Sequence, residues 1–520
     1  MGAAPALSSL EYPYGQGHEY FERIISILDS GEGNSMDMSK LEQELEKRGR
    51  ELMRILLQEH LNNRSPGTSS EPVMDADGIE RIETPTHDRK IETVFGRVEL
   101  DRAGYGNQGC KSLHPLDAEL NLPPEIYSLE LQRRVAEEAA KNSFDEVVES
   151  IAKTTGGNVP KRQAEEVVQR AARDFDAFYE TRKCCWSEEE TTGSVLAITA
   201  DGKGVVLHEK DLREKTRKAA EKRRQKMGKR LSQGEKMNAK RMATVAAVYT
   251  TDSFERSPED LVSEIGPRIK KMKRPPIENK RVWASLEKEP EEVIKAAFTE
   301  AQNRDPNHQK NWVALVDGNN TQIKILRNIA KAQGIDLTII VDIIHVIEYL
   351  WKAGRVFHPE SGPKLEQWVE HRLRKVLQGN AGHMAGGMRR SATRKKISKK
   401  KRKPVDQCAT YLLNKSPYLK YNRYLSKGFP IGTGVIEGAC RHLVKDRMEI
   451  TGAKWTLQGA EAVLRLRALR SSKDFDAYWT FHEDYEYKRN HEALYADGSV
   501  PATTNSKSYA KNTGHLKIIK

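Results

Sequence analysis

The sequence predicts an α/β core that follows a mainly helical N-terminal region and is interrupted by a basic helical insertion. Three observations lead to this architecture. Four apolar, strand-like runs alternate with helical patterns between residues 193 and 342, which is typical of an α/β sheet. A pair of short helices joined by a glycine turn precedes these runs, and a polar, basic, mainly helical segment follows them.

The N-terminal region begins with an amphipathic helix. Leucines recur at helical spacing in "MSKLEQELEKRGRELMRILLQEHL", residues 38–61, so we predict a helix there and a candidate self-association element. A polar linker occupies residues 62–78. The alternating segment "ETVFGRVELDRAGYG" then predicts a β-hairpin.

The segment "SFDEVVESIAKTTGGNVPKRQAEEVVQRAARDF" predicts two short helices. Ser143 is a suitable N-cap for a helix to about Lys153, and a Thr-Thr-Gly-Gly-Asn turn follows. The second helix opens at Pro160, with side chains in its first turns that can contact bases: Lys161, Arg162 and Gln163. This order predicts a DNA-binding helix-turn-helix, although ordinary αα-hairpins share the pattern.

The strands of the core come next. Helices are predicted at residues 289–301 and in "TQIKILRNIAKAQG", which closes on Gly334. The four strand-like runs are "SVLAITADG", "MATVAAVYTTD", "NWVALVDGNN" and "DLTIIVD".

Three acids are candidates for chemistry. Asp201 and Asp317 each follow directly on an apolar strand and precede a glycine, so we expect a tight turn that exposes each carboxylate. Glu437 lies among small residues in "FPIGTGVIEGACRHLVKDRM", where a turn becomes a helix. If that helix crosses the same sheet edge, the three carboxylates meet. Clustered acids need a hard divalent cation, and oxygen ligands select Mg²⁺ or Mn²⁺. The alternative is that each acid is a simple turn or surface residue.

The charge pattern points to a polyanionic partner. The net charge is +13, and it is concentrated in two basic arms. Residues 208–241 hold 14 lysines and arginines against five acids, and residues 389–403 hold ten bases and no acid. Such arms suit nucleic acid, because each neutralised phosphate releases counterions. Solvated loops that aid solubility are the alternative. A membrane partner is not expected, because neither arm carries an aromatic and leucine face.

Other classes are disfavoured. There is no long apolar run for a membrane span and no secretory signal. The five cysteines include no CxxC pair, which argues against a disulfide framework or zinc site and for the cytoplasm. No GxxxxGK[ST] loop occurs, and "GTGVIEG" lacks the third glycine of a dinucleotide loop, so no nucleotide cofactor is expected.

Four blocks of sequence carry a family resemblance: "ITADGKG", "ALVDGNN", "VDIIHVIEYLW" and "PIGTGVIEGACRHLVKDRMEITGAKWTLQGAEAVLRLRAL". They resemble the signature blocks of DDE transposases from bacterial insertion sequences, in the Kra-type group related to Mutator elements. The similarity spans roughly residues 193–470. It implies an RNase H-like catalytic core with an acidic triad, which by motif match falls on Asp201, Asp317 and Glu437 and holds two Mg²⁺ or Mn²⁺ ions. The segment at residues 359–427 is similar to the helical insertion of that family.

Further residues are candidates for support or DNA contact. Asp342 and His345 form a D-x-x-H that resembles a family element thought to support the active site and contact DNA. The alternative is a histidine satisfied at a helix N-terminus, and we do not expect His345 to be a metal ligand.

The block after Glu437 holds four more candidates for DNA contact: Arg441, His442, Lys445 and Trp455. Arg441 is at i+4 from Glu437, so a plain intrahelical ion pair is the alternative for it. Trp455 can stack on an unpaired base or pack in the core.

The resulting fold class is an α/β RNase H-like core interrupted by a helical insertion, with a mainly helical N-terminal DNA-binding region. The predicted segments are 1–85 (helical segment and linker), 86–190 (hairpin and helix-turn-helix), 191–357 (core, first part), 358–430 (basic insertion), 431–470 (core, second part) and 471–520 (C-terminal tail).

The sequence therefore predicts a metal-dependent DNA transposase that binds terminal inverted repeats and target DNA as a dimer or larger assembly on the bacterial nucleoid. Three alternatives remain: a structure-specific nuclease such as a junction resolvase, a non-catalytic DNA-binding protein derived from a transposase, and a scaffold without chemistry.

Overall fold

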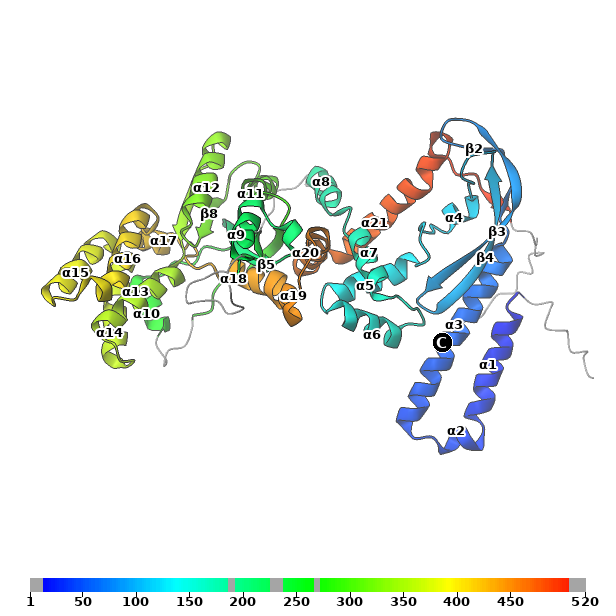
Figure 1. The fold of residues 1–520 in the computed structure, drawn as a ribbon, viewed down its shortest axis with the longest axis horizontal. Coiled ribbons are helices and arrows are strands. Elements are labelled where there is room, and N and C mark those ends of the chain that lie inside the picture. Colours follow the sequence, from blue (N-terminus) through cyan, green and yellow to red (C-terminus); the bar gives the residue numbers. More distant parts are fainter. Residues whose placement is uncertain (1–12, 186–191, 225–236, 266–271, 505–520) are drawn as a thin grey trace, which may run out of the picture. The chain divides into compact units, whose positions relative to one another are not determined.

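The computed structural model describes residues 13–185, 192–224, 237–265 and 272–504 (Figure 1). The chain divides into two compact units, Phe175–Phe475 and a unit made of Met1–Asp174 with Asp476–Lys520. We call them the core unit and the N-terminal unit. The division differs from the predicted segments, because the residues after 476, expected to form a tail, belong to the N-terminal unit.

The core unit is built on a five-stranded mixed sheet with the order β7-β6-β5-β8-β9. β7, β6 and β5 are antiparallel, whereas β5, β8 and β9 are parallel. The four predicted strands are confirmed. β7, which was not predicted, is an edge strand whose first half is charged. The bounds are β5 (Val195–Val206), β6 (Lys240–Thr251), β7 (Glu278–Ser285), β8 (Asn311–Val316) and β9 (Leu337–Val341).

The register of the parallel strands fixes which residues are level at their ends. Thr199 of β5 is opposite Leu315 of β8. Val316 of β8 is opposite Val341 of β9. β5 is paired with β6 along its whole length and extends past the last residue of β8.

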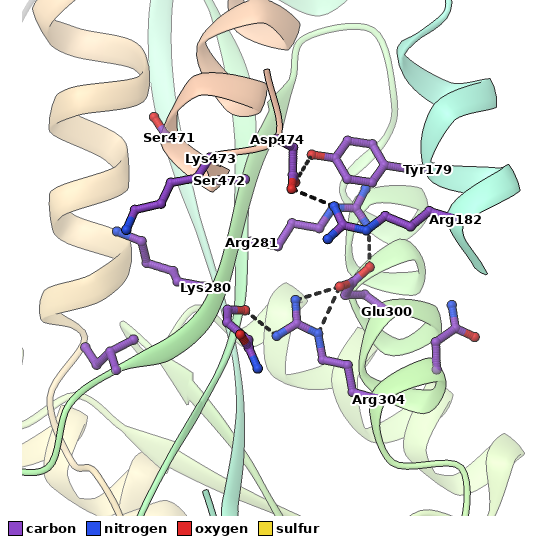
Figure 2. Close-up of a pocket in the computed structure, with 13 residues that line it drawn as sticks. Tyr179, Arg182, Lys280, Arg281, Glu300, Arg304, Ser471, Ser472, Lys473 and Asp474 are labelled. Atoms are coloured by element: carbon purple, nitrogen blue, oxygen red, sulfur yellow. Dashed lines mark hydrogen bonds and ion pairs between the residues drawn. The ribbon is translucent and has the colours of Figure 1, made fainter. Parts of the chain in front are cut away.

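Helices surround this sheet, and buried polar groups fix two of them. Glu461 of α20 accepts hydrogen bonds from the Leu286 N–H (2.7 Å) and the Ser285 hydroxyl (2.8 Å), which holds α20 against β7. Asp474, after α20, accepts from the Tyr179 hydroxyl (2.8 Å) and from Arg182 (2.6 Å) of α8 (Figure 2). The helices outside the insertion are α8 (Phe175–Cys185), α9 (Glu214–Arg224), α10 (Pro258–Ile265), α11 (Pro290–Arg304), α12 (Asn320–Gln333), α13 (Ile343–Phe357), α18 (Gly434–Ala439), α19 (Asp446–Met448) and α20 (Leu457–Ser472).

The segment predicted as a helical insertion is helical. Its α16 packs against α13 and α15, and the Tyr421 hydroxyl of α17 donates to the Val341 carbonyl at the end of β9 (2.7 Å). The basic stretch at residues 389–403 covers the end of α15 and the start of α16, whereas residues 225–236 of the other arm lie outside the described residues. The bounds are α14 (Pro363–Leu377), α15 (Ala381–Arg394), α16 (Lys399–Lys415) and α17 (Tyr421–Ser426).

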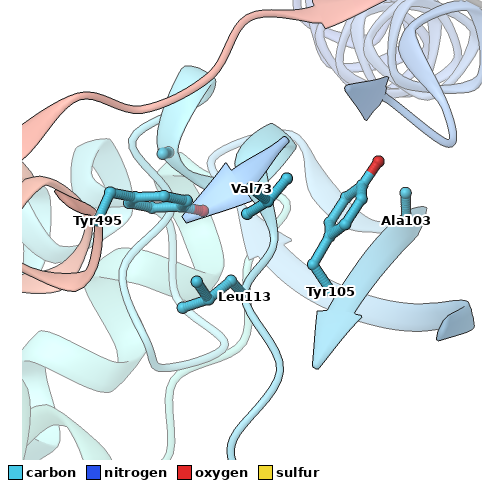
Figure 3. Packing of buried hydrophobic residues seen from close by; sticks show 6 residues of the cluster. Val73, Ala103, Tyr105, Leu113 and Tyr495 are labelled. Atoms are coloured by element: carbon cyan, nitrogen blue, oxygen red, sulfur yellow. The ribbon is translucent and has the colours of Figure 1, made fainter. Parts of the chain in front are cut away.

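The N-terminal unit combines a helical hairpin, a three-stranded sheet and a helical group. α1 packs against α3, and β2, β3 and β4 form the antiparallel sheet. Tyr495, which follows α21, joins Val73, Ala103, Tyr105 and Leu113 in one apolar cluster (Figure 3). The bounds are α1 (Gly15–Leu28), α2 (Gly31–Ser35), α3 (Met38–Arg64), β1 (Thr68–Ser69), β2 (Val73–Met74), β3 (Glu80–Thr93), β4 (Gly96–Gly106), α4 (Pro115–Glu119), α5 (Leu129–Ala139), α6 (Phe144–Thr154), α7 (Lys161–Ala171), α21 (Phe475–Asn490) and β10 (Thr503–Thr504).

The two helices predicted around the glycine turn are present. α6 begins with a capping box in which Ser143 accepts from the Glu146 N–H (3.3 Å) and Glu146 accepts from the Ser143 N–H (2.8 Å). The turn packs on the β3–β4 hairpin, because the Gly156 N–H donates to the Val94 carbonyl (2.8 Å). A Cβ at Gly156 would lie 2.3 Å from the Phe95 carbonyl oxygen. The close packing of this turn on the hairpin therefore requires a glycine at position 156.

Candidate active site

Three aspartates are level across neighbouring strands of the core unit. Asp201 lies two residues beyond the last residue of β5 that pairs with β8, and Asp317 lies two residues beyond its partner. Asp342 directly follows β9 and is level with Asp317. Since neighbouring strands are about 4.8 Å apart, the three residues form a row that runs across the strands, at the level where β8 and β9 end.

Asp201 reaches this row in a different way from the one predicted. It lies inside β5 and is paired with Val245 of β6, so the expectation of a tight turn after it was wrong. Pairing with β6 continues β5 beyond the last residue of β8. The carboxylate of Asp201 is half-buried at the level where β8 ends. The Gly202 N–H donates to its Oδ1 at 2.6 Å.

Asp317 does lie at a turn. Its Oδ1 accepts from the Asn319 N–H (2.7 Å), and its carbonyl accepts from the Tyr411 hydroxyl of α16 (3.0 Å). Gly318 has φ +95°, and a Cβ there would lie 2.8 Å from the Tyr411 hydroxyl. The glycine is needed both for the turn and for the approach of Tyr411.

Asp342 is fully buried and joins two segments. It is the N-cap of α13, where it accepts from the His345 N–H (3.3 Å) and from His345 Nδ1 (2.9 Å). Its other oxygen accepts from the Thr433 N–H (3.1 Å). The aspartate therefore ties the end of β9 to the turn that begins α18.

Glu437 projects from α18 toward this row. The Thr433 hydroxyl donates to Glu437 Oε1 (3.1 Å), and the Cys440 thiol donates to Asp201 Oδ2 (3.4 Å). Potential ligand atoms of Asp342, His345 and Glu437 all lie within 4.8 Å of one another. We call Asp201, Asp317, Asp342 and Glu437 the acid site.

The pKa of His345 reflects the acids around it. The hydrogen bond to Asp342 raises this pKa above its ordinary value, and the negative charges of Asp342 and Asp317 also raise it, against the effect of burial. Burial raises the pKa of Tyr411, and Asp317 and Asp342 are among the charges that raise it further.

The pKa of Cys440 reflects the other two acids, Asp201 and Glu437. Burial raises the pKa of its thiol, and the charge of Asp201, its hydrogen bond to Asp201 and the charge of Glu437 raise it further. The thiol is therefore protonated at neutral pH, which allows it to donate to Asp201. His345 thus responds to Asp342 and Asp317, whereas Cys440 responds to Asp201 and Glu437.

The acid site can hold a metal ion. Among the residues that the structure describes, no lysine or arginine forms an ion pair with any of its four carboxylates, while Asp317 Oδ2 and Glu437 Oε2 accept no hydrogen bond there. Asp342 and Glu437, with ligand atoms within 4.8 Å of each other, repel unless a cation neutralises them. Carboxylate oxygens such as these suit a hard divalent cation.

The bases after Glu437 lie on a π-helical turn, Cys440–Lys445. Arg441, His442 and Lys445 are exposed, and Arg441 and His442 contact Asp446 at 3.7 and 3.0 Å. The ion pair considered between Arg441 and Glu437 is not formed, because the wider turn breaks the i+4 alignment. Such π-turns often lie at functional sites.

Trp455 is buried, with 7% of its surface exposed. Its indole N–H donates to the Met448 carbonyl (3.1 Å), and its backbone bonds to Val206 and His208 extend β5. This favours the core-packing alternative over base stacking.

The predicted DNA-reading residues of the N-terminal unit are at the start of α7. Lys161 and Arg162 are exposed, and Gln163 is half-buried. Lys161 pairs with Asp145 of α6 (2.8 Å), and both Arg162 and Gln163 contact Glu166 (3.3 Å). The ion pairs of Lys161 and Arg162 involve exposed side chains and are weak, so a stronger partner can replace them.

A second Asp-His-Glu group lies in the N-terminal unit. Asp174, His482 and Glu486 are buried, with potential ligand atoms within 4.8 Å of one another. Arg489 pairs with both acids, and Arg173 pairs with Glu486. Two arginines already neutralise this group, which we call the Asp174 cluster, so it is structural.

Sequence reasoning missed three residues that donate hydrogen bonds to the acid site: Tyr411, Thr433 and Cys440. Thr433 and Cys440 flank Glu437 at helical distances, which is a usable signal. Tyr411 comes from the insertion, and nothing in the sequence indicates that it reaches Asp317.

No protein-family model matches the chain, and no curated protein sequence matches it. In the part of the chain that the structure describes, every helix is too short or too polar to cross a membrane.

Proposed function

We propose that the chain is a DDE-type DNA transposase, which cuts DNA at the ends of its mobile element and joins those ends to target DNA. The observation that carries this proposal is that Asp201, inside β5, is level with Asp317 and Asp342 at the ends of β8 and β9, and that α18 brings Glu437 to Asp342. The mixed sheet and the helical insertion before α18 support the RNase H-like core that the sequence resemblance implies.

The residues have distinct roles in this proposal. Asp201, Asp317 and Glu437 would hold two Mg²⁺ or Mn²⁺ ions, which when bound activate the attacking hydroxyl and stabilise the leaving oxygen. Asp342 positions Glu437 through Thr433, and Tyr411 fixes the backbone of Asp317.

The chemistry consists of two in-line displacements at phosphorus. Water attacks the phosphodiester at an element end, and the P–O bond that breaks releases a 3′-hydroxyl. That hydroxyl then attacks a phosphate of target DNA, forming one P–O bond as another breaks. The same acids serve both steps.

DNA contacts are proposed at three places. Arg441, His442 and Lys445 lie one or two turns from Glu437, where Arg441 and Lys445 offer positive charge and His442 offers a hydrogen-bonding ring to the scissile backbone. α6 and α7 form the proposed helix-turn-helix for the terminal inverted repeats, with Lys161 and Arg162 exposed. The basic arms bind flanking or target backbone. Joining two ends calls for a dimer or larger assembly, acting on the bacterial nucleoid.

The proposal is tested by Mg²⁺-dependent nicking and strand transfer on a duplex that carries the DNA ends flanking the gene. The unmodified chain is compared with Asp317→Asn and with Asp336→Asn, a matched change at an exposed aspartate before β9. We expect Asp317→Asn to lose at least about 10³-fold in both reactions and Asp336→Asn to keep them.

Other outcomes decide against parts of the proposal. Cleavage without joining would favour a structure-specific nuclease that uses the same acids. Full activity in Asp317→Asn would remove this residue from the site. Binding without cleavage, whatever the divalent ion, would favour a non-catalytic DNA-binding protein.

A further inference from the structure

A cavity of about 410 Å³ lies on the β7 edge of the core unit, bounded by α8, the start of β7 and the ends of α11 and α20 (Figure 2). Its position differs from that of the acid site. Glu278 at the start of β7 is opposite Thr250 of β6, which is opposite Leu196 near the start of β5. Asp201 lies further along β5, at the level where β8 ends, and therefore toward the opposite end of the strands from the cavity.

The lining of this cavity is strongly basic. Two acids, Glu300 and Asp474, face five bases: Arg182, Lys280, Arg281, Arg304 and Lys473. The excess of positive charge is the first indication that the cavity suits an anion.

The arginines of the cavity form ion pairs with both acids. Arg281 and Arg304 pair with Glu300, and Arg182 pairs with Asp474. Burial opposes ionisation of Glu300, but the two arginines outweigh it and lower the pKa of this carboxyl. Both acids are therefore occupied by arginines in ion pairs, and they leave the lysines without a counter-charge.

Lys280 and Lys473 are exposed and have no ion pair or side-chain hydrogen bond with the described residues. Figure 2 shows that both side chains extend to the same side of the cavity. Two ammonium groups on one rim repel each other, and a phosphate between them would remove that repulsion.

The backbone at Lys473 gives an independent observation. This residue ends α20 in the left-handed region, with φ 64°, where glycine is the favoured residue. The chain thus keeps a lysine where its backbone is strained, as is often found at functional sites. Attraction of Lys473 to the C-terminal end of α20 is the competing explanation.

We propose that this cavity binds a backbone phosphate of DNA between Lys280 and Lys473, as a second DNA contact away from the acid site. The paired arginines below them hold the rim in place and keep it positive. The inference rests on the proposed action on DNA.

The test is the salt dependence of binding to a short linear duplex of arbitrary sequence, measured by fluorescence anisotropy. Three chains are compared: the unmodified chain, Lys280→Ala/Lys473→Ala, and the control Lys295→Ala/Lys331→Ala, which removes two exposed lysines outside the cavity. Each lost phosphate contact lowers the slope of log K against log salt by about 0.9. We expect the cavity variant to lose about 0.9 in slope, for the single phosphate held between the two lysines, and to bind about eightfold more weakly at 0.1 M salt, with the control unchanged.

A single variant, Lys473→Gly, separates binding from a structural role. Glycine relieves the left-handed backbone, so we expect the melting temperature to rise or stay level while DNA affinity falls. A fall in melting temperature with unchanged affinity would assign Lys473 to the helix end and overturn the inference.

The remaining outcomes distinguish this inference from the proposed function. Unchanged slope in the cavity variant of a chain that cuts DNA overturns the cavity alone. A reduced slope in a chain that cuts no DNA overturns the proposed function alone, and a chain that binds no duplex overturns both. If inorganic phosphate at millimolar concentration abolishes the difference between variants, the cavity takes free phosphate and not backbone.

Discussion

The two units each contain an Asp-His-Glu group, and the two groups differ in what neutralises their charge. In the Asp174 cluster, Asp174, His482 and Glu486 are buried, and Arg173 and Arg489 pair with the acids. The positive charges are built into the fold, so the cluster joins the end of α7 to α21 without a need for a ligand.

The acid site has similar residues, but no arginine pairs with its carboxylates in the described part of the chain. Asp342 is buried, His345 is half-buried and Glu437 is exposed, and the described residues provide no lysine or arginine ion pair to any of its carboxylates. His345 pairs with Asp342 at 2.9 Å, which leaves the charge of Asp201, Asp317 and Glu437 to be met by a cation from solution. Residue type alone therefore does not identify a metal site, and the partners of the acids decide between structure and chemistry.

The largest effect is expected on stability, from Arg489→Ala. Removal of this guanidinium leaves Asp174 and Glu486 buried with less compensation, which should lower the free energy of unfolding by about 3 kcal/mol. Urea unfolding measures this. Arg162→Ala is the control, because Arg162 is exposed, and it should cost less than about 0.5 kcal/mol. Equal stability in the two variants would show that Arg489 does not compensate the cluster.

Thermal unfolding with divalent ions tests which of the two groups binds a metal ion. Mg²⁺ or Mn²⁺ should raise the melting temperature of the unmodified chain, by the equivalent of about 1.4 kcal/mol at ten times the dissociation constant. Glu437→Gln should lose this increase. Glu486→Gln should have a lower melting temperature without ions and still show the increase. The reverse result would place the ion in the Asp174 cluster.

A smaller effect is expected from Tyr411→Phe. This change removes the hydrogen bond to the Asp317 carbonyl and keeps the stacking on Tyr349, whose ring centroid is 4.2 Å away. The loss of about 1 kcal/mol of positioning should slow DNA cleavage about fivefold. Tyr349→Phe, which keeps both rings, should leave the rate unchanged. Equal rates in both variants would exclude a positioning role for Tyr411.

The pH dependence of stability should have opposite signs in the two groups. Burial opposes ionisation of Asp174, but His482 and Arg489 outweigh it and lower its pKa, so its contribution is present above about pH 3.8 and is lost as the pH falls through the lowered pKa. The pKa of His345 is raised, so its contribution is present below about pH 6.5 and is lost as the pH rises through the raised pKa.

Urea midpoints across this pH range, without divalent ions, test the signs. His345→Gln should remove only the loss at higher pH, and Asp174→Asn only the loss in acid. A loss at higher pH that persists in His345→Gln would assign it to another group.

Much of the core could be predicted from the sequence, because its signals are local. β8, α12 and β9 follow from apolar runs, helical spacing and the terminal glycine at Gly334. α6 follows from its capping box at Ser143. β7 escaped prediction because an edge strand with a charged first half lacks the apolar run of its neighbours.

Long-range contacts could not be read in this way. The pairing of Asp174 with His482 joins residues more than 300 positions apart, and α21 was therefore taken as part of a tail. Asp201 was assigned to a turn because the continuation of β5 depends on pairing with β6. The level alignment of Asp201 with Asp317 is a property of the parallel register, which the sequence does not show.

The most direct test of the account is anomalous diffraction from crystals of the unmodified chain soaked in Mn²⁺. We predict a peak at the acid site, next to carboxylates of Asp317 and Glu437, and no peak at the Asp174 cluster. A peak at Asp174, His482 and Glu486, or an acid site that stays empty at saturating Mn²⁺, would contradict the claim that the uncompensated acids are the metal-binding centre.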